Sequence, residues 1–122
     1  MIVILLAVAL ASSFNQPAPE MNGTEVMLSA VAPRTIEEHV KLYFADIPIM
    51  TEIARCESQF KHRGVNGTVI KGLVDPQDTG VMQINKRYHA KTAEELNLNL
   101  NDIGDNMAYA RYLYEKYGTD PW

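Results

Sequence analysis

Helical spacing of apolar residues in two separate stretches is the strongest constraint on how this chain can fold. In residues 36–58 the spacing begins with Ile36, Val40 and Phe44, which recur four positions apart. It returns in residues 103–117, where apolar side chains recur three and four positions apart. Such spacing is typical of amphipathic helices that bury one face. The stretch between them lacks it, so we expect the chain to be mostly, but not entirely, helical.

Capping signals divide the first stretch into two helices. Thr35 precedes Glu38 by three positions, as in a capping box, and predicts a helix start. Pro48 ends this helix and suits the first turn of a second one, which we expect to cover about residues 49–58.

The second predicted helix places Glu57 beside apolar side chains. At 100° per residue, Ile49, Ile53 and Cys56 share a stripe that we expect to be buried, and Glu57 lies within about 40° of Ile53. Desolvation and the negative end of the helix dipole would both raise the pKa of this carboxyl. Glu57 is therefore a candidate general acid, and the alternative is a solvated glutamate at a frayed helix end.

The middle and the end of the chain supply further elements. Asn66-Gly67, followed by β-branched residues, predicts a small hairpin within residues 61–73. Thr92 opens a capping box that predicts a short helix to about residue 96, and Asp102 is the predicted cap of the last helix. The predicted class is α+β, mostly α, with about five helices and one small β-hairpin.

A second carboxylate stands before a distinctive run. Asp78 is followed by Thr-Gly-Val-Met-Gln-Ile-Asn, and Glu57 lies within Cys-Glu-Ser-Gln-Phe at residues 56–60. Cleavage of a glycosidic bond uses two carboxylates in different surroundings, one protonated and one ionised. The alternative for Asp78 is a turn residue that bonds nearby backbone N–H groups.

Both segments resemble the signature of the lysozyme-like superfamily, above all the small soluble lytic transglycosylase (SLT) domains of bacterial cell walls. The run after Asp78 is also similar to that of chicken-type lysozymes. The resemblance implies a lysozyme-like fold and cleavage of the β-1,4 bond between N-acetylmuramic acid and N-acetylglucosamine in peptidoglycan. In transglycosylases the glutamate matching Glu57 donates a proton and then accepts one, and 1,6-anhydro-muramyl ends form. In lysozymes the aspartate matching Asp78 is a second catalytic group, so this residue does not distinguish the two chemistries.

The same resemblance implies a set of substrate-binding residues: Ser58, Gly80, Val81, Met82, Gln83, Asn106, Tyr109 and Tyr112. Gly80 would let the backbone approach a sugar closely, Gln83 would hydrogen-bond an acetamido or hydroxyl group, and Met82 would line the cleft. Ser58 orients the acid or bonds to its own helix backbone. For the two tyrosines, packing is the favoured alternative.

Charge and cysteine content narrow the remaining functions. With a net charge of −4 and no Lys/Arg cluster, the chain is not expected to bind nucleic acid. The three histidines lack metal-ligand spacing, so we expect no metal and no cofactor. Cys56 is expected to pack in the core, while the resemblance implies a partner cysteine in a tail after residue 122. A cysteine hydrolase using Cys56 with His62 or His89, and a non-catalytic wall-binding or assembly module, are the alternatives from other classes.

The N-terminus indicates export. Residues 1–11 form an apolar run too short to span a bilayer, and they end in Ala-Leu-Ala, as signal peptides do. No Lys or Arg precedes the run, as would fit a truncated leader, and a buried first element is the alternative. Residues 12–34 read as a flexible linker, and residues 35–122 as the lysozyme-like domain. We expect a monomer in the periplasm, cell envelope or extracellular space, bound to glycan strands and touching membrane only through an uncleaved leader.

Overall fold

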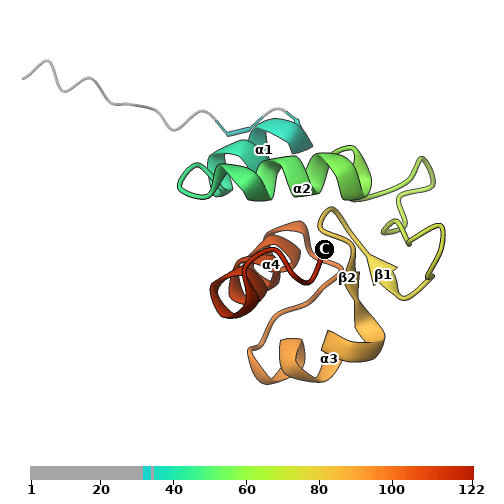
Figure 1. Cartoon of the computed structure of the whole chain (residues 1–122). Helices are drawn as coiled ribbons and strands as arrows, with labels where there is room; N and C mark the ends of the chain where they lie inside the picture. The colour runs from blue at the N-terminus through green and yellow to red at the C-terminus, as the bar shows by residue number, and fades with distance from the viewer. Residues whose placement is uncertain (1–31, 34) are drawn as a thin grey trace, which may run out of the picture. The chain divides into compact units, whose positions relative to one another are not determined.

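The computed structural model of the chain (Figure 1) describes residues 32–33 and 35–122. The predicted leader (1–11) and almost all of the predicted linker (12–34) lie outside the described residues, and the described residues belong to one compact unit. The described part contains four helices and one two-stranded antiparallel sheet: α1 (Ile36–Tyr43), α2 (Pro48–Ser58), β1 (Asp78–Thr79), β2 (Ile84–Asn85), α3 (Lys86–Glu95) and α4 (Ile103–Tyr117). The predicted class, α+β and mostly helical, is confirmed.

The helix count is four in the described residues instead of the predicted five, and the third helix begins earlier than expected. The side chain of Asn85 caps α3 by accepting the N–H of Arg87 at 3.0 Å. Thr92 therefore lies inside α3 and does not start a helix of its own. An asparagine cap at the end of β2 starts the helix before the later capping box can act.

The predicted hairpin at residues 61–73 forms only in outline. Asn66-Gly67 does turn the chain, since the Gly64 N–H donates to the Thr68 carbonyl at 2.9 Å, but the only pairing across this turn in the described residues is one bridge between Arg63 and Val69. The regular sheet lies instead at β1 and β2, which pair Asp78 with Asn85 and Thr79 with Ile84. The chain after the turn changes partner at Lys71, which bridges to Thr79, so no ladder extends from the hairpin.

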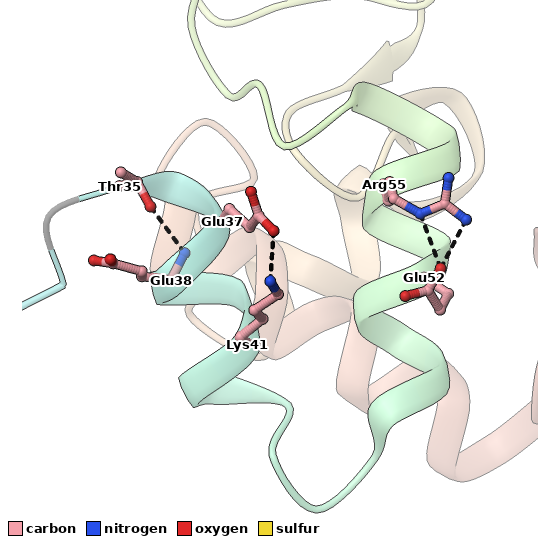
Figure 2. Close-up of polar contacts among 6 residues, drawn as sticks. All are labelled: Thr35, Glu37, Glu38, Lys41, Glu52 and Arg55. Carbon is pink, nitrogen blue, oxygen red and sulfur yellow. Dashed lines mark hydrogen bonds and ion pairs between the residues drawn. The ribbon is translucent and has the colours of Figure 1, made fainter.

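The solvent faces of α1 and α2 carry the caps and ion pairs shown in Figure 2. Thr35 caps α1 by accepting the Glu38 N–H at 3.1 Å, as predicted. Exposed ion pairs join Lys41 to Glu37 within α1 and Arg55 to Glu52 within α2. Solvent-exposed pairs of this kind contribute little to stability, because water screens the two charges. The two helices are held to the rest of the protein by their opposite, apolar faces.

The buried face of α2 differs from the predicted stripe. Its buried residues are Met50, Thr51, Ala54 and Ser58, whereas Ile49 is 47% exposed and Cys56 is also exposed. The prediction that Cys56 is buried is therefore wrong. The face of α2 that packs on the core has small residues, Thr51 and Ala54, at its centre, and small side chains allow the helix to approach its neighbours closely.

Arg111 of α4 holds the turn between α1 and α2. Its guanidinium donates to both carboxylate oxygens of Asp46, at 2.8 and 2.9 Å, and to the Tyr43 carbonyl at 2.7 Å. A forked pair of this geometry fixes orientation as well as distance. The contact therefore ties α4 to the turn that leads into α2, the helix that carries Glu57.

A buried amide connects α4 to the segment between the strands. Asn106 is fully buried, accepts the Met82 N–H at 2.9 Å, and donates to the carbonyls of Thr79 and Leu100 at 3.0 Å each. Gly80 sits against this amide with a φ of +75°, and a Cβ there would lie 2.6 Å from the Asn106 Nδ2 atom. Packing against Asn106 therefore explains why position 80 is glycine.

We predict that Asn106→Ala lowers the free energy of unfolding by about 2–5 kcal/mol, because a backbone N–H and two carbonyls lose their partner in a buried place. Urea denaturation measures the change. Gln77→Ala, which removes an amide from an exposed residue, is the control and should change stability by less than about 0.5 kcal/mol. Equal stabilities of the two variants would contradict the structural role given to Asn106.

Candidate active site

Two adjoining cavities share three of the predicted site residues. A cavity of about 360 Å³ and one of about 510 Å³ are both lined by Glu57, Asp78 and Gln83. These side chains come from the end of α2, from β1 and from the turn before β2. The structure thus brings both predicted catalytic carboxylates, and the amide predicted to bind substrate, to one place.

The carboxyl group of Glu57 is biased towards its protonated form. Partial burial at the cavity raises the pKa of Glu57, and the negative charge of Asp78 raises it further. Although the residue as a whole is exposed, its carboxyl group is shielded enough for desolvation to be the larger effect. This is the environment expected for a general acid.

Asp78 is oriented by a neighbouring amide. The Asn85 Nδ2 group donates to Asp78 Oδ1 at 2.8 Å and to Asp75 Oδ2 at 3.0 Å, across the β1–β2 pair. Gly72 allows the preceding loop to approach, since a Cβ there would lie 2.4 Å from the Asp75 carbonyl and 3.0 Å from Asp78 Oδ2. Asp78 is therefore a carboxylate with a fixed orientation in the cavity, held by a side chain and not by the nearby backbone N–H groups of a turn.

Gln83 is held in an unusual backbone conformation. Its φ is +49°, and its Nε2 group donates to the Gly80 carbonyl at 2.8 Å. Left-handed backbone at a residue other than glycine is costly and occurs often at functional sites. The amide is thus fixed where it lines both cavities.

Four predicted binding residues are buried away from the cavities. Val81, Met82 and Asn106 are fully buried, and Tyr109 is 1% exposed, so their side chains are not available to a ligand. They pack in the core or, for Asn106, bond to backbone. The prediction that Met82 lines the cleft is wrong, because an aliphatic-Met pair next to a buried glycine is core here.

Of the three other predicted binding residues, only Ser58 lines one of the two cavities. Gly80 is buried and meets Asn106 and His62 instead of a cleft surface. Ser58 lines the larger cavity, but its hydroxyl donates to the Ala54 carbonyl at 3.0 Å, as in the alternative we gave for it. Tyr112 lines neither cavity, and its hydroxyl accepts from Lys116 at 2.8 Å.

Several residues that line the smaller cavity were not predicted as substrate-binding residues, among them Asn85, Tyr88, His89 and Trp122. Asn85 was visible as the last residue of the run after Asp78. Trp122 gave no local signal, because it reaches the cavity from the end of the chain by donating its indole N–H to the Met82 carbonyl at 3.0 Å.

Both histidines considered as partners for Cys56 are engaged elsewhere. His62 Nδ1 accepts the Val81 N–H at 3.1 Å, so its Nε2 carries the proton and donates to the Asn101 carbonyl at 2.8 Å. His89 bonds to the Tyr109 hydroxyl at 3.1 Å. In the described part of the chain neither histidine is hydrogen-bonded to Cys56.

Within residues 32–33 and 35–122, no group of three or more His, Cys, Asp or Glu side chains is arranged to hold a metal ion. None of the helices described there has the length and apolar character needed to cross a membrane.

Comparison of the chain with protein-family models, with curated proteins and with solved structures found no match.

We predict that folding stability falls as pH drops below about 6.5, the usual pKa of histidine. Burial lowers the pKa of both His62 and His89, outweighing the opposing effect of the His62 bond to Asn101. Below that pH the unfolded chain binds more protons than the folded one, so stability decreases until the folded-state pKa is passed. Urea midpoints from pH 8 to 5 measure this.

The control for this pH dependence is a third histidine. His62→Gln should flatten the pH dependence of the urea midpoint, whereas His39→Gln, on α1 and outside these hydrogen bonds, should retain it. A pH dependence that is the same in both variants would contradict the role given to His62.

We predict that a thiol reagent labels Cys56 rapidly in the native protein, because the residue is exposed. Cys56→Ala should change stability by less than about 0.5 kcal/mol. The control is Ala54→Cys in a Cys56→Ala background, which places the thiol on the buried face of the same helix and should label slowly. Slow labelling of Cys56 itself would show that this face of α2 is covered.

Proposed function

We propose that this protein is a lytic transglycosylase that cleaves the β-1,4 bond between N-acetylmuramic acid and N-acetylglucosamine in bacterial peptidoglycan. The observation that carries the proposal is the position of Glu57, a carboxyl group with a raised pKa in a cleft that also holds Asp78 and Gln83. The resemblance of both sequence segments to SLT domains supports it. We also propose that the α+β arrangement around this cleft is a variant of the lysozyme-like fold.

The reaction uses Glu57 twice. Its carboxyl group gives a proton to the glycosidic oxygen as the bond from that oxygen to C1 of the muramic acid breaks. The substrate's acetamido group stabilises C1. The Glu57 carboxylate then takes the proton of the C6 hydroxyl, whose oxygen bonds to C1 and closes a 1,6-anhydro ring. No water, metal or cofactor enters this balance.

The walls of the cleft fit a sugar chain. The smaller cavity combines aromatic surface from Tyr88 and Trp122 with polar groups from Gln83 and His89. Aromatic faces pack against the apolar faces of sugars, while amides bond to hydroxyl and acetamido groups. Gln83, fixed by its bond to Gly80, is the amide we assign to the sugar nearest the reacting bond.

A lysozyme-type hydrolase is the second candidate, and one observation favours it. Asn85 holds Asp78 in a fixed orientation in the same cleft as Glu57, as a nucleophile or charge stabiliser requires. In that mechanism water would be consumed and reducing ends would form. A non-catalytic wall-binding module would use the same cleft without either product.

The proposed substrate lies outside the cytoplasm. Export to the periplasm, cell envelope or extracellular space is therefore part of the proposal, with residues 1–11 as the signal that directs it.

Digestion of purified peptidoglycan, followed by mass spectrometry, tests the proposal. We expect 1,6-anhydro-muramyl ends from the wild-type protein, and a loss of about a hundredfold or more in Glu57→Gln, the range for a positioned acid. The control is Glu52→Gln, five residues earlier on α2, where the carboxylate pairs with Arg55 on the exposed face. Thermal melting of both variants separates loss of activity from loss of fold.

Asp78→Asn distinguishes the two chemistries. For a transglycosylase this variant should lose far less activity than Glu57→Gln, because the substrate supplies the second group. Reducing ends, together with near-complete loss in both variants, would favour the lysozyme mechanism. Full activity of Glu57→Gln would remove this residue from the reaction.

A further inference from the structure

The larger cavity is lined by two cations that no described residue neutralises. Lys61 and Lys71 line it beside Glu57 and Asp78. Within residues 35–122 neither lysine forms an ion pair or a side-chain hydrogen bond. The other lysines there all have partners: Lys41 with Glu37, Lys86 with Asn101, Lys91 with Glu95 and Lys116 with Tyr112.

These cations do not serve to ionise the catalytic acid. The pKa of Glu57 is raised by burial and by the charge of Asp78, and no lysine lowers it. A cation placed to stabilise the Glu57 carboxylate would have the opposite effect. Lys61 and Lys71 therefore remain available to an anion that enters from outside.

The same cavity has an apolar edge in a fixed position. Leu73 and Val74 are fully exposed, at 104% and 100%, and both line it. The loop that carries them is anchored to β1, since the Gly72 N–H donates to the Asp78 carbonyl at 2.9 Å and Lys71 bridges to Thr79. Cationic and apolar groups are thus held together on one side of the carboxyl pair.

The smaller cavity, which shares Glu57, Asp78 and Gln83 with the larger one, has a different lining. It is lined by aromatic and amide groups and contains no lysine or arginine. A ligand that spans both cavities would therefore meet sugar-binding surface on one side and a cationic, partly apolar surface on the other.

We propose that the larger cavity binds the short anionic peptide attached to the muramic acid, while the smaller cavity binds the glycan. This proposal rests on the proposed function and adds that the site selects the peptide-bearing form of the substrate. Lys61 and Lys71 pair with peptide carboxylates, and Leu73 and Val74 contact the methyl and methylene groups between them. The enzyme then prefers peptide-bearing strands to strands from which the peptides have been removed.

Two substrates test the proposal: soluble glycan strands that retain their peptides, and the same strands after an amidase has removed them. We expect wild-type kcat/KM to be higher on the peptide-bearing strands. Lys61→Gln/Lys71→Gln should lower that value about three- to tenfold, mainly through KM, as two solvent-exposed ion pairs would. In this double variant the ratio of kcat/KM between the two substrates should be smaller than in the wild type. The wild-type ratio should also decrease as salt is added.

The control is Lys41→Gln/Lys91→Gln, which removes the same charge from α1 and α3 outside both cavities. It should keep the wild-type preference. Equal kcat/KM of the wild type on both substrates would overturn the peptide site and leave the proposed function intact. So would an equal loss in both double variants, which would indicate a general charge effect with any wall polyanion. No cleavage of either substrate would refute the proposed function and, with it, this proposal.

Discussion

The buried amide of Asn106 is the interaction on which the rest of this structure depends. It bonds at once to the segment between the strands, through Thr79 and Met82, and to the loop before α4, through Leu100. Without it, these three backbone groups would each lose a buried hydrogen-bond partner, at a total cost of about 2–5 kcal/mol. The hydrogen bonds of Asn106 hold β1 and the turn before β2, and β1 carries Asp78. The geometry of the cleft therefore depends on Asn106, although Asn106 does not line the cleft.

Much of the helical frame and part of the site could be predicted from the sequence, because the signals are local. The cap of α1 by Thr35 depends only on residues three positions apart, so packing elsewhere in the protein does not change it. The two carboxylates, Glu57 and Asp78, were found for a different reason. Each lies in a short motif that resembles a known family, and this resemblance suggested a catalytic role that helical spacing alone would not indicate. Both residues line the same two cavities in the structure.

What could not be predicted depends on contacts between distant segments. The apolar pattern of α2 allows two stripes, and only packing against the core selects the one that leaves Cys56 exposed. Met82 was expected to line the cleft because of its place in the motif, yet it is fully buried, whereas Tyr109 is buried as its favoured alternative, packing, predicts. Trp122 reaches the cleft through a bond to a residue 40 positions earlier, for which the sequence gives no indication.

The most direct test of the account is the titration of the Glu57 carboxyl group, followed by NMR in protein labelled with ¹³C at glutamate side chains. Glu57→Gln assigns the signal. The account predicts a midpoint above the usual value for glutamate, about 4.3. It also predicts that Asp78→Asn lowers this midpoint without restoring the usual value, because burial is the larger cause and the charge of Asp78 the smaller. A midpoint at or below the usual value in the wild type would contradict the assignment of Glu57 as a general acid.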